Sequence, residues 1–366
     1  MNQDNIKRQF EQDFEQAKKS IGRPNILLIG KTGVGKSTLI NTIFGKKLAD
    51  ISHTKPQTRG FHKYSSPNLP VNIIDSEGYE LGKEQYFLTQ LKEYISSHHA
   101  DIKEQVHIAW YALSVSSGRI LDFDLEVISV LKQSKIPTAV VFTQCDLDDV
   151  DGSAAKAMSN IVYKRFKDTV PCFETSNDPE LNKTLDIDAL VEWSANNISD
   201  ENLRSGFIAS QCASLNLKKE SVDKCIRIYV GLAAGVAVSP IPMSDSILLM
   251  GLQTKMAADI YSKYGIDTSA SDLIQQTIKN NLVSIIGKMA AGNLIKMIPT
   301  IGSWVGAGIN ALVASSITYG LGQTISYMCR KAIKAAWNGE TFEPISDELF
   351  KKMADQFTKE YKEKNQ

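Results

Sequence analysis

The stretch that decides the fold is Gly30-Lys31-Thr32-Gly33-Val34-Gly35-Lys36-Ser37. It matches the pattern G-x-x-x-x-G-K-[ST], and it stands between an apolar run typical of a buried strand (NILLIG, 25–30) and a helical pattern. Glycines in such a loop let backbone N–H groups point inward around phosphate oxygens. We expect Lys36 to reach the β and γ phosphates and Ser37 to ligate Mg²⁺. The loop and the adjacent Thr38 are therefore predicted to bind a nucleotide, and a glycine-rich turn without a ligand is the alternative interpretation.

The order of elements around this loop predicts an α/β domain followed by a helical one. Strand-like runs at 71–75, 106–115, 138–142 and 171–174 alternate with helical runs near 84–98, 121–133, 151–167 and 186–198. Such alternation is typical of a mainly parallel sheet covered by helices. After residue 200 the strand signal stops. We therefore expect an amphipathic helix (1–22), a nucleotide-binding domain (23–198), an all-α, Ala/Gly-rich domain (199–340) and a C-terminal amphipathic helix (341–366).

Three further motifs follow strand-like runs, and together they favour GTP over ATP. In Asp-Ser-Glu-Gly (75–78), the Asp75 carboxylate can hold Mg²⁺ through water, and the Gly78 amide can sense a γ phosphate. In Thr143-Gln144-Cys145-Asp146, the Asp146 carboxylate can accept two hydrogen bonds from the guanine edge, which adenine cannot supply. In the last motif, Glu174-Thr175-Ser176-Asn177, a backbone amide can meet the guanine carbonyl. Because open α/β sheets bind ligands at the carboxyl ends of their strands, we expect all these residues beside the phosphate loop.

With GKTGVGKS, DSEG, TQCD and ETSN in this order, residues 25–198 resemble the small GTPases of the translation-factor-related class, closest to the bacterial Era-like group. The resemblance implies that the chain binds GTP or GDP with Mg²⁺ and hydrolyses GTP. It also implies that Thr58 is the switch threonine that closes on Mg²⁺ in the GTP state, with Thr54 as the less favoured candidate. Under this interpretation Lys36 and Thr58 are catalytic, and Ser37, Thr58 and Asp75 hold the metal.

Two positions depart from the pattern of that family. Gln144 stands where the family has a lysine whose stem packs over the base, so we expect guanine selectivity through Asp146 but weaker affinity. Tyr79 follows the DSEG motif where Ras-type members have the glutamine that orients the attacking water. Some relatives replace that glutamine with a potassium ion held by an asparagine of the phosphate loop, but Gly33 occupies this position here. We therefore expect slow hydrolysis, or hydrolysis assisted by another residue, a partner or self-assembly.

The composition excludes several other classes of protein. Lys plus Arg and Asp plus Glu both number 41 among 366 residues, so the net charge is zero, which disfavours a strongly basic nucleic-acid binder and a disordered chain. Five cysteines without a CxxC pair fit a reducing compartment rather than a disulfide framework or a zinc site. The charged, sparsely apolar start disfavours a signal peptide. We expect a cytoplasmic protein that binds no nucleic acid.

Other chemically suggestive residues receive simpler interpretations. His98 and His99 are adjacent rather than four apart, so they cannot present both rings to one metal from a helix face, and we expect a solvated helix end. Trp110 and Tyr111 lie on a predicted buried strand and are expected in the core. No catalytic triad or metal-ligand cluster competes with the nucleotide site.

The helical half contains a run without charged residues over 33 positions, 297–329, and a shorter apolar run at 228–239. Its PIP-x-x-D (240–245) and Tyr264-Gly265 pieces look like a bacterial domain family of unknown function, found after Era-like G domains and in some membrane-associated proteins. The long run exceeds the ~20 residues that span a bilayer, but Pro299 and many polar residues interrupt it. We favour a soluble or peripherally attached bundle over membrane-inserted hairpins.

The two ends of the chain each carry an amphipathic pattern. Residues 1–22 place Ile6, Phe10, Phe14, Ala17 and Ile21 on one stripe, and 345–366 place Leu349, Met353, Phe357 and Tyr361 on another. The stripes either pack together beside the G domain or cover separate patches of core. The sequence as a whole predicts a GTP-driven switch with the helical half as its output. A dynamin-like membrane-acting GTPase and a nucleotide-gated scaffold are the alternatives, and self-association is expected through either half.

Overall fold

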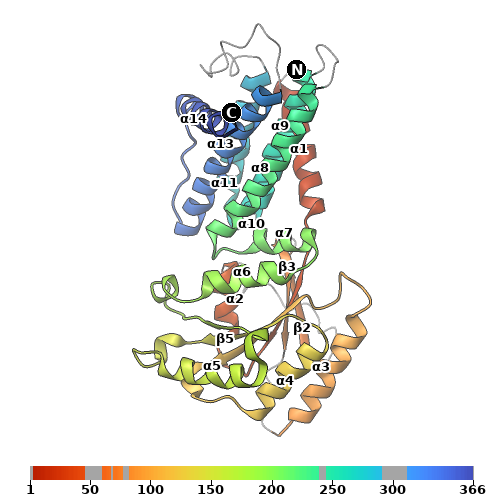
Figure 1. Cartoon of the computed structure of the whole chain (residues 1–366), viewed down its shortest axis with the longest axis vertical. Helices are drawn as coiled ribbons and strands as arrows, with labels where there is room; N and C mark the ends of the chain where they lie inside the picture. Colours follow the sequence, from red (N-terminus) through yellow and green to blue (C-terminus); the bar gives the residue numbers. More distant parts are fainter. Residues whose placement is uncertain are drawn as a thin grey trace. The chain divides into compact units, whose positions relative to one another are not determined.

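The computed structural model describes residues 3–45, 60–66, 69–76, 82–238, 245–290 and 311–365 (Figure 1). The chain forms two compact units. One, here called the sheet unit, comprises Gly22–Ser214, and the other, the helical unit, comprises Met1–Ile21 together with Leu215–Gln366.

The sheet unit is built on six strands in the order β2-β3-β1-β4-β5-β6. Their bounds are β1 (Asn25–Ile29), β2 (Phe61–Ser66), β3 (Leu69–Ser76), β4 (Ile108–Ser114), β5 (Thr138–Thr143) and β6 (Cys172–Glu174). Neighbouring strands are parallel, except that β2 pairs antiparallel with β3. The mainly parallel sheet is therefore confirmed, but the edge strand β2 was not predicted. Its sequence, FHKYSS, buries only Phe61, so it lacks the apolar run or alternation that identifies a strand.

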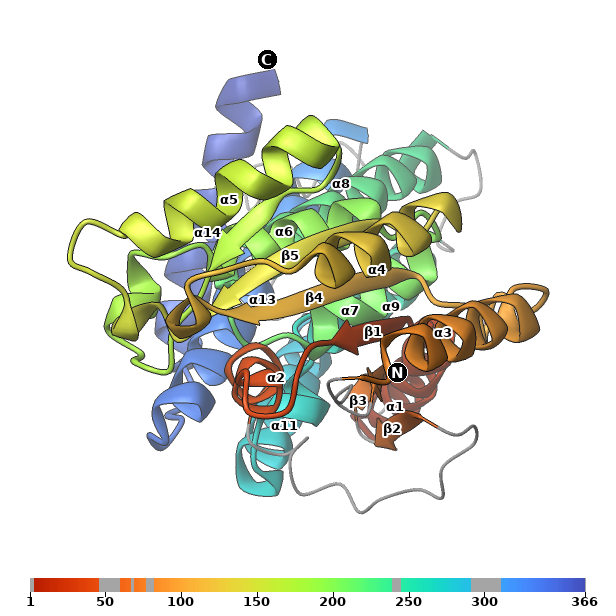
Figure 2. The ribbon, with the colours of Figure 1, turned by 90° about the horizontal axis from the view of Figure 1, so that it is seen from below.

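Helices cover both faces of this sheet. Their bounds are α2 (Lys36–Phe44), α3 (Glu84–His98), α4 (Asp122–Gln133), α5 (Ser153–Phe166), α6 (Ile187–Asn197) and α7 (Glu201–Ser210). Trp110 and Tyr111 are fully buried on opposite faces of β4, as expected for successive strand residues. Tyr111 donates a hydrogen bond to Asp124 of α4, and Trp110 donates one to Ser194 of α6. Figure 2 views the unit from the side of α3, α4 and α5.

Helix α7 belongs to the sheet unit, whereas the sequence places it in the helical domain. Phe207 of α7 packs against Phe44 and Trp110, with ring centroids 6.0 and 6.5 Å apart. Gly206 lies so close to the backbone that a Cβ atom there would overlap the carbonyl oxygen of Gly22. The unit therefore ends at Ser214 rather than near residue 198.

The helical unit consists of helices from both ends of the chain. They are α1 (Gln3–Ser20), α8 (Leu215–Val238), α9 (Asp245–Lys263), α10 (Ile266–Ser269), α11 (Asp272–Ala290), α13 (Ala311–Asn338) and α14 (Asp347–Asn365). Helix α13 contacts α8, α9, α11 and α14, and most of its side chains are buried. This explains why its sequence carries few charges.

The N-terminal helix packs on the helical unit through the stripe that the sequence predicts. Phe10, Phe14 and Ala17 are buried against α9 and α11. The Phe14 ring meets Tyr261 of α9 edge-on at 5.1 Å, and the Lys279 ammonium of α11 lies 4.4 Å from the Phe14 centroid. Helix α1 therefore joins a core made mostly of residues more than 200 positions later.

The C-terminal helix buries a neighbouring stripe more completely than the predicted one, of which Tyr361 still packs against Tyr319 of α13. Leu349 is 40% exposed, while Phe350, Ala354 and Thr358 are buried against α13. A Cβ atom at Gly320 of α13 would lie 2.7 Å from the Ala354 carbonyl oxygen, so the two backbones approach closely there. This close contact, rather than the largest apolar side chains, sets the face that α14 buries. Helices α1 and α14 cover separate parts of the core, as in the second of the two arrangements considered above.

Within the described ranges, no helix is long and apolar enough to cross a membrane. Much of the uncharged run (297–310) and the PIP piece (240–242) lie outside those ranges.

Candidate functional site

The phosphate loop turns from β1 into α2 as the sequence predicts. Gly33 and Gly35 adopt φ angles of +84° and +92°, a region that glycine enters without strain. Gly30 lies against β4, where a Cβ atom would come within 2.6 Å of the Ala112 carbonyl oxygen. Around them Val34 is buried, Lys31 and Thr38 are half-buried, and Thr32 and Ser37 are exposed. The glycines are therefore needed for the backbone path itself.

Lys36, the first residue of α2, reaches back across its own loop. Its ammonium donates hydrogen bonds to the carbonyl oxygens of Gly30 (2.8 Å) and Lys31 (3.4 Å). It also lies 3.8 Å from the Asp75 carboxylate, within ion-pair range. The Lys36 charge is therefore held against the loop backbone, where it would neutralise phosphate oxygens.

Asp75 lies near the end of β3 and fits a metal ligand. Burial raises the pKa of its carboxyl, and the charges of Lys36 and His62 act in the opposite direction. Its Oδ1 atom is buried and accepts no hydrogen bond from any residue that the structure describes. A buried carboxylate oxygen that accepts no hydrogen bond and lies 3.8 Å from the Lys36 ammonium of the loop suits a hard cation such as Mg²⁺.

The second motif, at the end of β5, is tied directly to the phosphate loop. The Thr143 hydroxyl donates to the Val34 carbonyl oxygen, and the Gln144 amide nitrogen lies 3.4 Å from the Gly33 carbonyl oxygen. Gln144 has a left-handed φ of 57°, and its amide oxygen accepts a short hydrogen bond from Ser114 at the end of β4. Gln144 therefore bridges two loops without carrying the charge that a lysine would bring.

The third and fourth motifs meet at Asp146. Its Oδ1 atom accepts hydrogen bonds from the Ser176 hydroxyl (2.6 Å) and, at 3.4 Å, from the Asn177 amide. The Ser176 bond is the largest cause of a lowered pKa at Asp146, so this carboxylate is ionised at neutral pH. An ionised carboxylate is an acceptor only, which suits the paired N–H groups of a guanine edge.

Several residues predicted for the site lie outside the described ranges. They are Thr54, Thr58, Gly78 and Tyr79. Their roles stay predictions.

Two residues that hold the site were not predicted. Ser114 caps the short 3₁₀ turn after β4 and holds Gln144. Asn182 accepts a hydrogen bond from the Ser176 amide at 2.8 Å and donates one to the Ser176 carbonyl oxygen at 2.6 Å, which pins the ETSN loop. Both are common polar residues without a recognisable spacing, so the sequence contains no signal for them.

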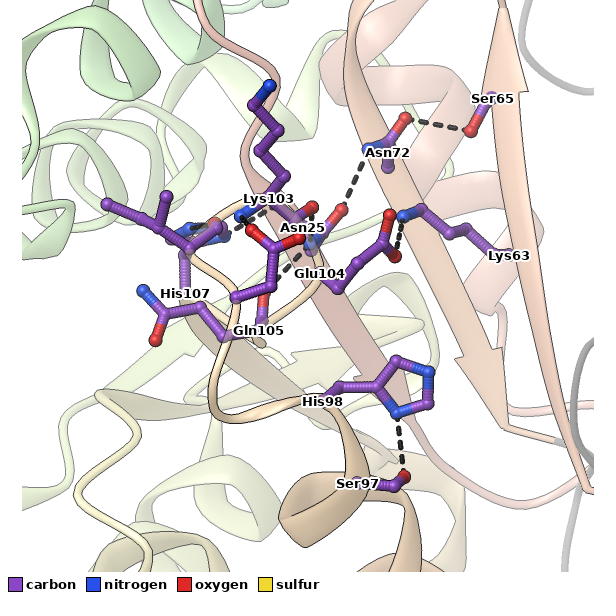
Figure 3. Close-up of polar contacts among 12 residues, drawn as sticks. Asn25, Lys63, Ser65, Asn72, Ser97, His98, Lys103, Glu104, Gln105 and His107 are labelled. Carbon is purple, nitrogen blue, oxygen red and sulfur yellow. Dashed lines mark hydrogen bonds and ion pairs between the residues drawn. The ribbon is translucent and has the colours of Figure 1, made fainter.

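At the opposite edge of the sheet, buried polar groups satisfy one another (Figure 3). Asn25 at the start of β1 donates to the carbonyl oxygens of Lys103 and Gln105, and its Oδ1 atom accepts from the Asn72 amide at 2.7 Å. The Asn25 backbone N–H donates to Nδ1 of His107 at 2.9 Å. Burial lowers the pKa of His107. This network joins β1, β3 and the segment before β4.

His98 and His99 end α3, as expected. The His98 ring stacks on Tyr94 at 4.3 Å, and His99 is exposed. Among the described residues, no group of three or more His, Cys, Asp or Glu side chains is placed to hold a metal ion.

Known proteins resemble part of this chain in sequence. The model of a family described as a 50S ribosome-binding GTPase matches residues 25–144. The probable GTP-binding protein EngB of Caldanaerobacter subterraneus subsp. tengcongensis is 31% identical over 139 residues, which is 38% of this chain and 70% of EngB. GTPase Era of Ruminiclostridium cellulolyticum is 30% identical over 158 residues, 42% of this chain and 50% of Era. This chain therefore spans about half the length of that Era protein.

Among solved structures, Toc33 of Arabidopsis thaliana in complex with GDP and Mg²⁺ matches with a TM-score of 0.37 and 17% identity. The match covers 54% of this chain and 93% of Toc33. Era in complex with MgGDPNP and part of 16S ribosomal RNA matches with a TM-score of 0.34 and 18% identity, over 49% of this chain and 58% of that one.

Proposed function

This chain belongs to the family of P-loop GTPases that includes Era and EngB, and we propose that it is a molecular switch that hydrolyses GTP slowly. The observation that carries the proposal is the convergence of the motifs at one sheet edge. Thr143 and Gln144 contact the phosphate loop, and Asp146 contacts Ser176. Hydrogen bonds within the protein thus hold both the residues proposed to bind phosphate and those proposed to bind the base.

The chemistry of the site follows from its charges. Lys36 and the inward N–H groups of the loop would stabilise the charge that develops on the transferred phosphoryl group. Ser37, Thr58 and Asp75 would hold Mg²⁺, which when bound would neutralise part of the phosphate charge. Tyr79 lacks an amide to orient the attacking water, so a low intrinsic rate is proposed.

The helical unit is proposed as the output of the switch. Its N-terminal helix α1 is followed directly by the start of the sheet unit, and α8 begins where that unit ends, so both chain connections lead into helices of the same bundle. A change in the sheet unit would reach the bundle through either connection.

Hydrogen–deuterium exchange of the full-length protein tests this coupling. Loaded with GDP or with a non-hydrolysable GTP analogue, the wild type should differ between states in amide exchange of α1 or α8. Identical exchange of the helical unit in the two states, with clear differences around the phosphate loop, would contradict the output role.

Two further candidates remain distinct from this one. A membrane-acting GTPase, peripheral to the inner face of a membrane, is favoured by the apolar helices, and vesicles should then stimulate turnover. A nucleotide-gated scaffold is favoured by Tyr79 and Gln144, and its turnover should stay near zero even with vesicles and at high protein concentration, where self-association through either unit would be complete.

Two observations bear on a nucleic-acid partner, and they point in opposite directions. The zero net charge disfavours it, whereas the ribosome-binding description of the matched family favours it. RNA binding that weakens steeply as the salt concentration rises would support a nucleic-acid partner.

A further inference from the structure

Gln144, the first residue after β5, holds a backbone conformation that residues other than glycine disfavour. Its φ and ψ angles are 57° and 36°, in the left-handed region that glycine enters without strain. Among the residues that the structure describes, Lys135 and Lys167 are the other two non-glycine residues with a left-handed φ, and they lie just after α4 and α5. A polar side chain kept at a strained position beside a binding loop points to a role for that side chain.

Ser114, the last residue of β4, lies beside the Gln144 side chain. It is the register partner of Thr143 in β5, so the two strands end together. The Ser114 hydroxyl donates a short hydrogen bond to Oε1 of Gln144, and Ser114 is only 7% exposed. The same hydroxyl accepts from the Ser116 backbone N–H at 3.2 Å and lies 2.7 Å from the Ser116 hydroxyl. Burial and these contacts hold the Ser114 hydroxyl in one place.

The hydrogen bonds at both ends of the Gln144 amide determine its orientation. The Gly33 carbonyl oxygen, 3.4 Å from Nε2, can only accept, so the nitrogen end of the amide must face the phosphate loop. The oxygen end then faces Ser114, whose hydroxyl has one hydrogen to donate. The Ser114 hydroxyl therefore favours one of the two orientations that the amide could adopt.

In this orientation the amide nitrogen has a hydrogen left for a ligand. Nε2 carries two hydrogens, and the Gly33 carbonyl oxygen takes one of them. Within the described part of the chain, the structure gives Nε2 no second acceptor. Gln144 also lies between the phosphate loop, which its side chain contacts, and Asp146, two residues later. A nucleotide that bound to both would pass beside this N–H group.

We infer that Ser114 is a positioning residue for nucleotide binding. It holds the Gln144 amide so that an N–H group of Nε2 donates to an oxygen of the bound nucleotide. Without the Ser114 hydroxyl, the amide could turn and present its oxygen, which would repel the oxygens of the ligand. The inference rests on the proposed function and adds a further residue to that same site.

Titration of the full-length protein with a fluorescent GDP analogue and Mg²⁺ tests the inference. Ser114→Ala should lower the affinity about fivefold, as expected for the loss of one neutral hydrogen bond. Ser114→Thr keeps the hydroxyl and should retain most of the affinity. Ser114→Cys, whose thiol is a weak donor, should lose nearly as much as Ser114→Ala and replaces it if that variant does not fold.

A double-mutant cycle separates positioning from a purely structural role. Gln144→Ala alone should lower the affinity about fivefold. Ser114→Ala should then add no further loss, because Ser114 acts through the Gln144 side chain. If Ser114 acted only through the stability of the fold, the two losses would multiply.

Ser117→Ala is the matched control on the same turn. The Ser117 hydroxyl donates to the backbone carbonyl oxygens of Ser114 and Arg119, at 2.8 and 3.2 Å, rather than to Gln144. This variant should bind the GDP analogue like the wild type.

Gln144→Gly tests the strained backbone. The affinity should fall about fivefold. The midpoint of urea unfolding without nucleotide should change little, because glycine suits the left-handed backbone and offsets the lost side-chain bonds.

Three results would overturn the inference while leaving the switch intact. They are wild-type affinity in Ser114→Ala, losses that multiply in the double variant, and wild-type affinity in Gln144→Gly with a lower unfolding midpoint. A wild type that binds no guanine nucleotide would instead contradict the proposed function, and the inference with it.

Discussion

Strands β1 and β3 lie side by side, and their two ends differ in how polar groups are treated. Toward their beginnings, the Asn72 amide donates to Asn25, the Asn25 amide donates to the carbonyl oxygens of Lys103 and Gln105, and Asn72 accepts from Ser65. At their ends, the buried Oδ1 atom of Asp75 accepts no hydrogen bond and lies 3.8 Å from the Lys36 ammonium, which donates to two loop carbonyl oxygens. We call the first edge saturated, because its polar groups have hydrogen-bond partners within the protein, and this edge stabilises the fold. We call the second edge unsaturated, because some of its polar groups lack partners that a bound ligand can supply.

The largest effect should come from the unsaturated edge. Lys36→Ala removes the charge at the centre of the phosphate loop, and nucleotide affinity should fall by a factor of roughly 100 to 1000, as expected for two charged hydrogen bonds. Titration with a fluorescent GDP analogue measures this. Lys63→Ala removes a lysine that pairs with Glu104 at the saturated edge, and it should leave affinity unchanged. Equal losses in both variants would remove the distinction between the edges.

The saturated edge should respond in stability instead. Asn25→Ala leaves two carbonyl oxygens and the Asn72 amide without partners in a fully buried place, so the free energy of unfolding should fall by about 3 kcal/mol. Urea unfolding measures the change. Ser65→Ala, which removes the half-buried end of the same chain of hydrogen bonds, should cost less than about 1 kcal/mol. A stable Asn25→Ala protein with impaired nucleotide binding would reverse the roles given to the edges.

At the unsaturated edge, selectivity for guanine should depend on Asp146. Asp146→Asn replaces an ionised acceptor by an amide, and GTP affinity should fall by a factor of about 10 to 100 with a shift in base preference. The same change at Asp148, whose carboxylate accepts from the amides of Ala154 and Ala155 at the start of α5, should affect stability and spare selectivity. Competition between GTP and ATP in both variants provides the test.

The smallest effect concerns pH at the saturated edge. Burial lowers the pKa of His107 below its ordinary value near 6.5, so the unfolded chain takes up this proton first as pH falls. The contribution of neutral His107 is therefore complete above about pH 6.5 and is lost as pH falls through the lower, folded pKa. Between pH 7.5 and 5.5, the free energy of unfolding, measured in urea, should fall less for His107→Gln than for the wild type. A larger fall in the variant would show that His107 does not cause the pH dependence.

The sequence predicts the backbone of the phosphate loop and the strand ends beside it, because the signals are local and the geometry is general. Glycines at 33 and 35 require the left-handed backbone that the loop adopts. Parallel strands bring residues such as Thr143 and Asp146 to one edge without any need to know the packing. Thr58 and Gly78 stay predictions, since they lie outside the described residues.

Packing between distant segments could not be predicted in the same way. Helix α7 belongs to the sheet unit because Gly206 fits against the backbone at Gly22, a contact across more than 180 positions. Helix α14 buries the Phe350 face because Gly320 admits it closely. Both outcomes depend on which backbones approach each other, and hydrophobic periodicity within one helix does not contain that information.

The most direct test of the central claim is a titration of the purified full-length protein with GTP and with ATP, each with and without Mg²⁺. The account predicts that GTP binds at least about 100-fold more tightly than ATP, since the ionised Asp146 accepts from guanine and not from adenine. It also predicts that Mg²⁺ strengthens GTP binding through Asp75 and Ser37. Equal affinity for the two nucleotides, or binding of neither, would contradict it.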